Sequence, residues 1–566
     1  MLDMKRVITF LGLGVLAVAP AVFAGACKAG SGLTSSGGNG GSAATGSGAA
    51  SGTMSTGSSP TSTGTFGSST ASTGTGLMGD PTTCAEAAMY RTYLGCDFYP
   101  TVNANNVWSL FDFAAVVANG QAMPATITVT RGGAPVGAPI TVQPNGLGTI
   151  YLPWVPELKG PDADCVGSAV PLTASVNSAQ GAYHLVSSLP VTVYQFNALE
   201  YKPQGGPPGK NWGSCPGNQC GTPCFSYSND ASLLLPSTAL TNNYRVIGYP
   251  SWQIANIGAT LTVTGTQDTT KVTVTLAPGA TIQAGGGIPA TAGGQTAKFT
   301  LNQGQVVELI GGTTSDFSGS LVQSDKPIQV INGLPCIDIP EGQQACDHIE
   351  ESVLPAETLG KHYVVTRPTG PAGQAVGAVI RLYGNVNGTH LTYPSGPLAG
   401  APAVLNAGQV VDMGVVNSDF EVSGDHEFGV AMFMQGGSVV DPNGNANNMG
   451  EGDPSQSIAI AVEQFRTKYI FLAPTDYDKN YVDIVAPGGA VMMLDGAPVS
   501  AGPQGVGAST YKVYRTPLGA GNNGAHVLTS TVPVGIQVLG YGLYTSYQYP
   551  GGLNLQLIAP PPPPPM

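Results

Sequence analysis

The residues of this chain that could do chemistry are most densely grouped at Asp347-His348-x-Glu350-Glu351. Alternate residues of a β-strand share a face, so a strand here would place His348 beside Glu350 and put Asp347 and Glu351 on the opposite face. An imidazole beside carboxylates can bind a metal ion or serve as an acid–base pair. The alternative is a structural loop whose polar groups hold two parts of the chain together. We favour the structural interpretation and predict that the chain is not an enzyme, with no catalytic residue in this cluster.

A second group of possible ligands is the loop from Asp441 to Asp453, where oxygen-bearing side chains alternate with other residues. Oxygen ligands in this pattern suit Ca²⁺, but an EF-hand loop has Gly at its sixth position and Glu at its twelfth. This loop has Ala446 and Gly452 there, and Asn and Gly are also common in ordinary surface turns. We therefore expect no cofactor and keep Ca²⁺ as the alternative, with Asp441, Asn443, Asn445 and Glu451 as its ligands.

Nine cysteines allow a third kind of chemistry. If Cys27 carries a lipid, eight remain, and an even number in an exported chain indicates disulfides. Cys336 and Cys346 are the best-supported pair because they bracket one short loop. The Cys215-x4-Cys220-x3-Cys224 cluster has no neighbouring His and lacks zinc-finger spacing, so we expect disulfides there and no metal. The cysteines available for the other disulfides are Cys84, Cys96, Cys165, Cys215, Cys220 and Cys224.

Residues 1–26 have the order of a signal peptide: Lys5-Arg6, then an apolar run, then Ala24-Gly25-Ala26. Signal peptidase could cleave after this run and release a secreted chain. A lipoprotein peptidase would cleave at the same bond and leave Cys27 as a lipid-bearing N-terminus. We predict the bacterial lipoprotein, exported to the outer membrane or cell surface, with simple secretion as the alternative. No other segment has about 20 uninterrupted apolar residues, so we expect the N-terminal lipid to be the chain's only membrane contact.

The composition excludes some partners and divides the chain into regions. Only 9% of its 566 residues are charged and the net charge is −13, which argues against a nucleic-acid partner and against docking on anionic lipids. Residues 27–82 are almost wholly Gly, Ser, Thr and Ala, so we predict a disordered linker there. Residues 559–566 form a polyproline tail.

Two motifs recur between the linker and the tail, which indicates a repeat protein. Ser-x-x-Pro-(Val/Ile)-x-(Val/Ile) occurs at 187–193, 324–330 and 530–536. Leu-Pro-x3-Leu-x3-Tyr-x-Val occurs at 235–246 and 354–365. The recurring residues are those of packing and turns, so we expect the repeats to be structural.

Short segments that alternate Thr with apolar residues, separated by Gly and Asn, are typical of β-strands and turns. The run 327–330, for example, predicts a half-buried strand. We predict an all-β fold of tandem, repeated β-sandwich-like units, preceded by the signal segment and the disordered linker. The alternative is a β-propeller in which each unit supplies two four-stranded blades. The predicted units are 84–201, 235–335, 354–436 and 462–550.

The segment Cys346-Asp-His-x-x-Glu-x-x-Leu-Pro resembles the signature of the N-terminal domain of the IgGFc-binding protein family. The flanking segments 324–328 and 360–365 and the late segment 526–550 are also similar to that domain. The resemblance covers residues 235–550. It identifies Asp347, His348, Glu351, Leu354 and Pro355 as the family motif.

This resemblance implies recognition of immunoglobulin Fc in the animal members of the family. The N-terminal segment here looks bacterial, so only the idea of a cell-surface interaction module carries over. We predict an extracellular surface protein that binds or adheres to a protein or glycan partner. The competing hypothesis is a secreted hydrolase on a propeller-like scaffold, which a His–carboxylate or metal site in a deep pocket would support.

Overall fold

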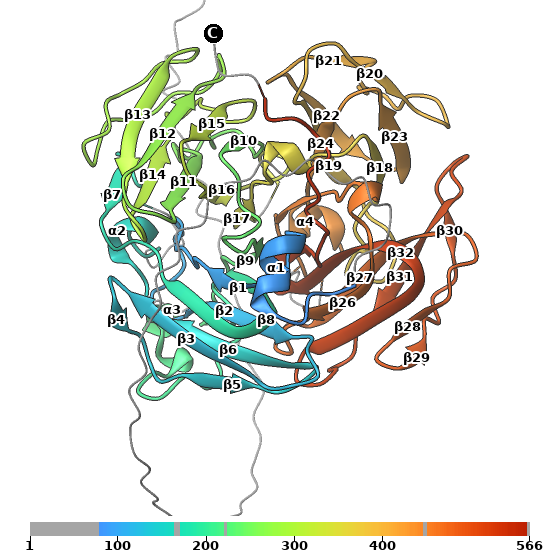
Figure 1. The fold of residues 1–566 in the computed structure, drawn as a ribbon, viewed down its shortest axis with the longest axis horizontal. Helices are drawn as coiled ribbons and strands as arrows, with labels where there is room; N and C mark the ends of the chain where they lie inside the picture. Colours follow the sequence, from blue (N-terminus) through green and yellow to red (C-terminus); the bar gives the residue numbers. More distant parts are fainter. Residues whose placement is uncertain (1–78, 164–169, 220–223, 344, 445–449, 563–566) are drawn as a thin grey trace, which may run out of the picture. The chain divides into compact units, whose positions relative to one another are not determined.

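The computed structural model describes residues 79–163, 170–219, 224–343, 345–444 and 450–562. The fold is nearly all β, with 6% helix and 44% strand, which confirms the predicted class. It contains several small sheets, a half-barrel and a four-blade, propeller-like arrangement (Figure 1). Within the described ranges, no helix is long and apolar enough to cross a membrane. The predicted signal peptide, the linker up to residue 78, Cys27, Cys165, Cys220 and Asn445 lie outside the described residues.

One pattern of strand pairing occurs four times in the described part of the chain, and we call these segments repeats 1 to 4. In repeat 2, a first sheet has the order β10-β15-β12-β13 and a second sheet the order β14-β11-β16-β17. Repeat 3 pairs its strands in the same way. The strands of repeat 2 are β10 (Asn243–Arg245), β11 (Thr260–Gly265), β12 (Thr270–Thr275), β13 (Thr296–Leu301), β14 (Val306–Ile310), β15 (Leu321–Ser324), β16 (Ile328–Ile337) and β17 (Asp347–Ser352), and those of repeat 3 are β18 (His362–Val365), β19 (Ala378–Gly384), β20 (Thr389–Thr392), β21 (Val404–Leu405), β22 (Val410–Val416), β23 (Phe420–Gly424), β24 (Phe428–Phe433) and β25 (Gln456–Ile458).

Repeats 1 and 4 follow this pattern with one long strand that serves both sheets. β8 pairs with β1 and β3 and then with β2 and β9, and β32 pairs with β26 and β28 and then with β27 and β33. The strands of repeat 1 are β1 (Gly95–Phe98), β2 (Phe113–Asn119), β3 (Ala125–Arg131), β4 (Ala134–Pro135), β5 (Ile140–Val142), β6 (Gly146–Leu152), β8 (His184–Asn197) and β9 (Asp230–Leu234), and those of repeat 4 are β26 (Arg466–Leu472), β27 (Lys479–Pro487), β28 (Met492–Leu494), β29 (Ala497–Pro498), β30 (Gln504–Gly505), β31 (Tyr511–Pro517), β32 (Ala525–Gly542) and β33 (Thr545–Pro550).

Few other elements complete the described part of the chain. β7 (Val176–Ser178) lies between β6 and β8 of repeat 1 in sequence but pairs with β14 of repeat 2. The helices are short: α1 (Cys84–Tyr90), α2 (Pro156–Lys159), α3 (Pro216–Gln219) and α4 (Gly437–Val440), with single 3-10 turns at Trp212–Ser214, Ala356–Thr358 and Val462–Gln464.

A proline marks the point where the chain passes from the first sheet of a repeat to the second. Pro190 and Pro533 lie within β8 and β32 where these strands change sheets, and Pro327 lies between β15 and β16. Proline has no N–H to donate, so it fits where the ladder of backbone hydrogen bonds is interrupted. The hydroxyls of Ser187 and Ser324 each donate to the backbone carbonyl two residues later, at 2.6 Å. The recurring Ser-x-x-Pro motif is therefore the corner between two sheets.

The last strand of a repeat lies farther along the chain than the sequence suggested. Segments predicted to end at residues 201, 335 and 436 continue to β9, β17 and β25 respectively. A connection rich in Gly, Pro or Asn precedes each of these strands, and such a composition resembles a linker between domains.

β16 is buried at every position and is not the half-buried strand that its first residues suggested. The polar side chains of Gln329 and Asn332 do not reach solvent but donate hydrogen bonds, both at 2.8 Å, to the carbonyls of Tyr99 and Thr260. The strand tolerates these polar residues at buried positions because neighbouring repeats and strands accept hydrogen bonds from their NH₂ groups.

A buried tyrosine in the first strand of repeats 2, 3 and 4 joins that strand to the second sheet. Each hydroxyl donates to the carbonyl of the residue that follows the corner and accepts from the N–H three residues earlier. Tyr244 donates to Ile328 (2.5 Å) and accepts from Thr241 (3.1 Å), Tyr363 pairs with Phe428 (2.6 Å) and Gly360 (3.1 Å), and Tyr469 pairs with Val534 (2.5 Å) and Arg466 (3.0 Å).

We expect Tyr363→Phe to lower the free energy of unfolding by about 1–3 kcal/mol, because it leaves a buried N–H and a buried carbonyl without their partner. Urea denaturation of the variant measures this loss. Tyr90→Phe, at the end of α1, is the control and should change stability by less than about 0.5 kcal/mol. An unchanged denaturation midpoint for Tyr363→Phe would show that the repeated hydroxyl is dispensable.

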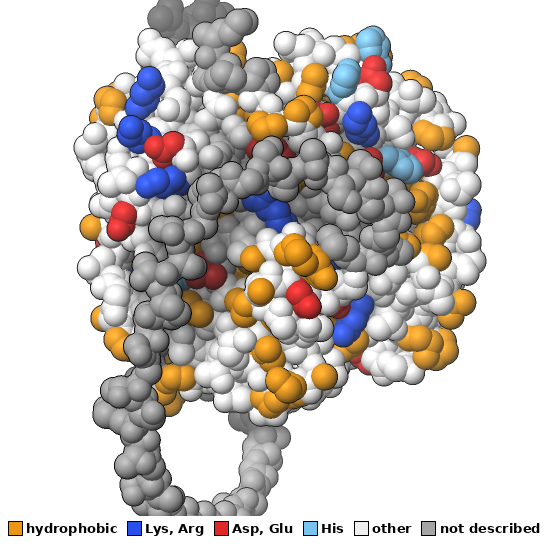
Figure 2. All heavy atoms as spheres, in the orientation of Figure 1, with side chains coloured by type: hydrophobic (Ala, Val, Ile, Leu, Met, Phe, Trp, Pro, Cys, Tyr) orange, Lys and Arg blue, Asp and Glu red, His pale blue; other side chains and the backbone are white. Residues whose placement is uncertain are grey.

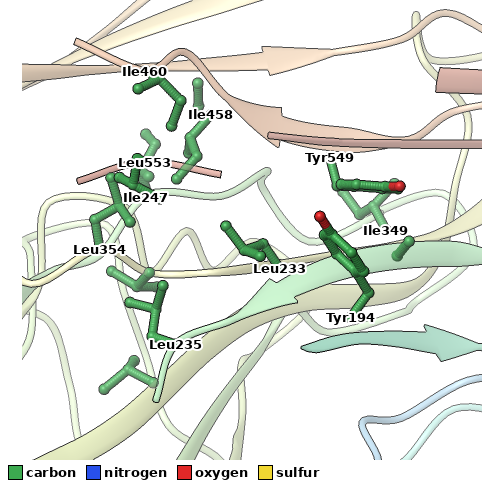
Figure 3. Close-up of a cluster of buried hydrophobic side chains, with 14 of the residues drawn as sticks. Tyr194, Leu233, Leu235, Ile247, Ile349, Leu354, Ile458, Ile460, Tyr549 and Leu553 are labelled. Carbon is green, nitrogen blue, oxygen red and sulfur yellow. The ribbon is translucent and has the colours of Figure 1, made fainter. Parts of the chain in front are cut away.

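Aliphatic side chains close one end of the region where the last strands meet. They come from the last strands and from the segments that follow them, so each repeat contributes to one cluster (Figure 3). Leu235 and Leu354 are the leucines of the recurring Leu-Pro motif. The members shown are Leu233, Leu235, Ile247, Ile349, Leu354, Ile458, Ile460 and Leu553, with Tyr194 and Tyr549 beside them.

Candidate functional site

The last strands of the four repeats meet in one buried junction. β9 contacts β17 and β33, and β25 contacts the same two strands. The predicted cluster of Asp347, His348, Glu350 and Glu351 lies on β17 and therefore faces the other repeats, with each side chain at most 1% exposed.

Asp230, the first residue of β9, connects all four repeats. Its carboxylate accepts the N–H groups of Ala231 (2.9 Å), Glu350 (3.0 Å), Gln456 (2.9 Å) and Gln548 (3.4 Å). These four N–H groups stand at equivalent register positions of β9, β17, β25 and β33. The hydroxyl of Ser455 adds a fifth hydrogen bond, at 2.7 Å.

Asp347, at the start of β17, ties repeat 2 to repeats 1 and 4. Its carboxylate accepts the N–H of Asn229 (2.7 Å) and both the hydroxyl of Thr545 (3.0 Å) and the N–H of Ser546 (3.3 Å). It also accepts the N–H of His348, at 2.7 Å. The carboxylate thus bridges backbone segments that are more than a hundred residues apart.

Glu350 lies on the same face of β17 as His348, as expected for alternate residues of a strand, and Nε2 of His348 is 3.6 Å from Oε2 of Glu350. The side-chain donors around the carboxylate come from repeat 1. They are the amides of Gln195 (3.1 Å), Asn197 (2.5 Å) and Asn103 and the hydroxyl of Ser232 (3.1 Å).

The electrostatics of the junction follow from its burial. Burial raises the pKa of Asp230, Asp347, Glu351 and Asp453 well above their usual values, while hydrogen-bond donors partly oppose this. Neighbouring carboxyls raise the pKa of Asp347 and Glu351 further. In the ranges that the structure describes, no three His, Cys, Asp or Glu residues are grouped to hold a metal ion. The junction can fix four repeats to one another, and its carboxyls have no access to a substrate.

The remaining motif residues have packing roles. Leu354 joins the aliphatic cluster, and Pro355 immediately precedes a 3-10 turn. Cys336 and Cys346 form a disulfide, so the connection before β17 is closed at its base. Two further disulfides join Cys84 to Cys96 and Cys215 to Cys224.

The possible calcium loop is closed by a protein contact: Asp441 accepts the N–H of Glu451 at 3.0 Å. Asn443 is exposed. Calcium binding remains a prediction.

Asp230 and Asp453 are the important residues that the sequence did not reveal. Asp453 accepts the N–H of Ala345 at 3.0 Å and so joins the connections of repeats 2 and 3. A weak signal existed for Asp230, because it is the one charged residue before the largely apolar run Ala231 to Leu235. Asp453 ends the loop that was considered for Ca²⁺, and its Gly-rich surroundings gave no sign of a buried position.

Comparison with known proteins places this fold in a family. The human IgGFc-binding protein is 30% identical over 186 residues, which are 33% of this chain and only 3% of that protein. No solved structure matches the chain. The family model described as IgGFc binding protein matches residues 230–540, more than half of the chain's 566 residues and a span that begins at Asp230 itself. The chain therefore belongs to the IgGFc-binding protein family.

Proposed function

We propose that this chain is an exported protein whose folded part binds an extracellular protein. The observation that carries the proposal is the use of the family signature: His348 is buried among four repeats, and the carboxylates beside it act as structural connections. The signature thus maintains a scaffold, and recognition belongs to the surface loops, as is usual for rigid β scaffolds. This geometry does not support the hydrolase alternative, because a substrate cannot reach these buried side chains.

The surface fits recognition by uncharged contacts. Figure 2 shows one face on which charged side chains are few and scattered among uncharged ones. This agrees with the low charged fraction of the chain, 9%. The net charge of −13 also repels an anionic glycan, so a protein partner is favoured over such a glycan.

The binding proposal is tested with an array of folded extracellular proteins, immunoglobulin Fc among them, printed with and without their glycans. The mature full-length chain should bind at least one protein in both forms. Binding only to the glycosylated form would identify a glycan partner. Binding to none, at micromolar concentration, would contradict the proposal.

We further propose that a lipid on Cys27 anchors the chain to a membrane, because Cys27 directly follows a charged, apolar and small-residue segment. Cys27→Ser should then move the protein from the membrane fraction to the soluble fraction of the producing cell. Ser31→Ala, a few residues later, is the control and should leave the distribution unchanged. An intact mass of the mature protein without acyl chains would contradict the anchor and leave simple secretion.

A further inference from the structure

The outer edge of the second sheet differs among the repeats. In repeat 2 the edge strand β14 is covered by β7, which comes from repeat 1 (Figure 1). In repeat 4 the short strand β30 covers β31. In repeat 3 the edge strand β22 pairs with β19 alone among the described strands. In repeat 1 β6 also ends its sheet, but it contains Gly146 and Gly148, which weaken a strand. β22 is therefore the edge that is best suited to add a further strand.

β22 and the covered strand β14 begin with the same residues. The run Leu-Asn-x-Gly-Gln-Val-Val occupies 301–307 and 405–411, so residues 306–308 correspond to residues 410–412. The three residues of β7 pair with residues 306–308 of β14. Residues 306–308 are fully buried, whereas two of residues 410–412 are half-buried and the third, Asp412, is exposed. Repeat 3 thus presents, without a cover, the stretch that β7 covers in repeat 2.

The backbone groups of Val410 and Asp412 face away from β19. The carbonyl of Gln409 accepts the N–H of Gly384, in β19, at 3.0 Å. The hydrogen-bonding direction alternates along an antiparallel strand, so residues 409 and 411 face β19 and residues 410 and 412 face outward. Both outward residues can therefore donate an N–H and accept at a carbonyl, as a further antiparallel strand requires.

The same alternation fixes how β7 binds. The carbonyl of Gln305 accepts the N–H of Gly265, in β11, at 3.0 Å, so residues 306 and 308 face β7. Their partners in β7 are Ser178 and Val176. The N–H groups of these two residues consequently point toward β14, and that of Asn177 points away.

A glutamine side chain adds a contact that β22 can reproduce. In repeat 2, Oε1 of Gln305 accepts the N–H of Asn302 at 3.0 Å, and Nε2 donates to Oδ1 of Asn177 in β7 at 2.8 Å. In repeat 3, Oε1 of Gln409 likewise accepts the N–H of Asn406 at 3.0 Å. Gln409 therefore holds its NH₂ group ready for an acceptor on an added strand.

The open stretch of β22 is as short as β7. Gly414 has φ 63° and donates its N–H to the carboxylate of Asp412 at 2.7 Å, which forms a bulge in the strand. Just before Gly414, Met413 is approached by Gly400, where an added Cβ would lie 3.4 Å from Cα of Met413. Bulges protect sheet edges from unwanted pairing, and this one limits the accessible stretch to residues 410–412.

The charges near this stretch favour an uncharged occupant. Oδ2 of Asp412 lies 3.5 Å from Nε of Arg381, which already donates to Asp316 at 2.6 Å. An acidic residue on an added strand would meet Asp412 without a free cation to balance it. β7 and its neighbours, residues 172–182, contain no charged residue.

We propose that residues 410–412 of β22 form a binding site for an extended, uncharged segment of an extracellular protein, which adds to the second sheet of repeat 3 as β7 adds to that of repeat 2. Addition of a strand to an exposed sheet edge is a general mode of peptide recognition, in which backbone hydrogen bonds supply the affinity. The inference rests on the proposed function and adds a sheet edge to the surface loops as a place of contact.

A synthetic peptide of residues 172–182 is the probe, because it contains the segment that binds the equivalent edge. Saturation-transfer NMR with the peptide in excess over the mature full-length chain should give a dissociation constant below about 1 mM. A peptide that is N-methylated at Ser178 should bind about threefold to tenfold more weakly, since it lacks one backbone hydrogen bond. The peptide that is N-methylated at Asn177 is the matched control and should bind like the unmodified one.

A substitution in the chain locates the peptide. Val410→Pro removes an outward N–H, which an edge strand tolerates, and should weaken peptide binding to a similar extent. Thr300→Pro is the matched control: the carbonyl of Gln295 accepts the N–H of Leu276 at 2.9 Å, so residue 300 faces outward from the edge strand β13. It should leave peptide binding unchanged, and both variants should keep the thermal midpoint of the wild type.

The array protein that binds most tightly provides the second test. Hydrogen–deuterium exchange should slow in the peptide that covers residues 405–416 when this protein is bound, and Val410→Pro should weaken its binding. Binding of an array protein with exchange unchanged there overturns the edge site and leaves the proposed function standing. If no array protein binds, the proposed function fails, and the synthetic peptide alone decides whether the edge accepts a strand.

The synthetic peptide and the self-association of the chain can also overturn the inference. Equal binding by the peptides N-methylated at Ser178 and at Asn177 would contradict strand addition. A dimer of this chain that Val410→Pro dissociates would make a second copy the occupant and overturn the assignment to a partner protein.

Discussion

Replacing Asp230 by Asn is expected to lower the free energy of unfolding by about 3–5 kcal/mol, because several buried donors lose their acceptor at about 1–3 kcal/mol each. The carboxylate accepts N–H groups from β9, β17, β25 and β33 at once. An asparagine keeps one carbonyl oxygen as an acceptor. Its NH₂ group would face the remaining N–H donors and cannot accept hydrogen bonds from them. Hydrogen bonds are therefore lost in all four repeats.

Hydrogen–deuterium exchange detected by mass spectrometry tests this mechanism beyond simple stability. In Asp230→Asn, amide protection should fall together in peptides that contain Ala231, Glu350, Gln456 and Gln548, the last of which lies 318 residues from Asp230. Urea denaturation gives the size of the loss.

The matched control is Glu351→Gln, because Glu351 is equally buried but its backbone donors, Ser352 and Leu233, belong to β17 and β9 alone. It should cost less than about 1 kcal/mol. A loss of protection confined to the peptide with Ala231 would show that Asp230 stabilises only its own strand.

The sequence predicted those parts of the fold whose causes are local. Ser324 and Pro327 are three positions apart, and the serine hydroxyl donates to the carbonyl of Lys326 between them, so a corner could be recognised as a motif. The tyrosine of the Leu-Pro motif likewise accepts from an N–H only three residues away. These motifs recur along the chain because the repeats share the same corner between two sheets.

The junction could not be predicted because its interactions are far apart in sequence. Asp230 contacts N–H groups 120, 226 and 318 residues later, and no local pattern records such contacts. The last strands were also separated from their partners by long connections, so that Asp347 and His348 looked like part of a loop between units. The residue types at the junction suggested chemistry, and only their burial shows a structural role.

The free energy of unfolding is expected to decrease as the pH rises from about 5 to about 8. Burial is the largest cause that raises the pKa of Glu308 to about 8 and that of Glu200 to about 8, above the value of about 4.3 of an unfolded chain. Between about pH 5 and 8, a carboxyl with a raised pKa therefore holds its proton in the folded state and has lost it in the unfolded state. Stability is therefore fully present below pH 4 and is lost as the pH rises through 8, by about 1.4 kcal/mol per pH unit for each group.

Glu308→Gln should remove the share of this pH dependence that Glu308 contributes. Glu308 accepts the N–H of Ala104 at 2.8 Å through Oε1, while Oε2 has no hydrogen-bond partner among the described residues. A neutral amide can keep the first bond and place its NH₂ at the second position without a charge. The variant should lose less stability between pH 5 and 8 than the wild type, and its stability should match or exceed that of the wild type above pH 8.

Exposed Glu341→Gln is the control and should leave the slope of the urea midpoint against pH unchanged. Equal slopes for Glu308→Gln and the wild type, or a wild-type stability that rises with pH, would mean that the buried carboxyls are ionised in the folded state. The donors around Asp230 and Asp347 would then be strong enough to overcome the cost of burying their charge.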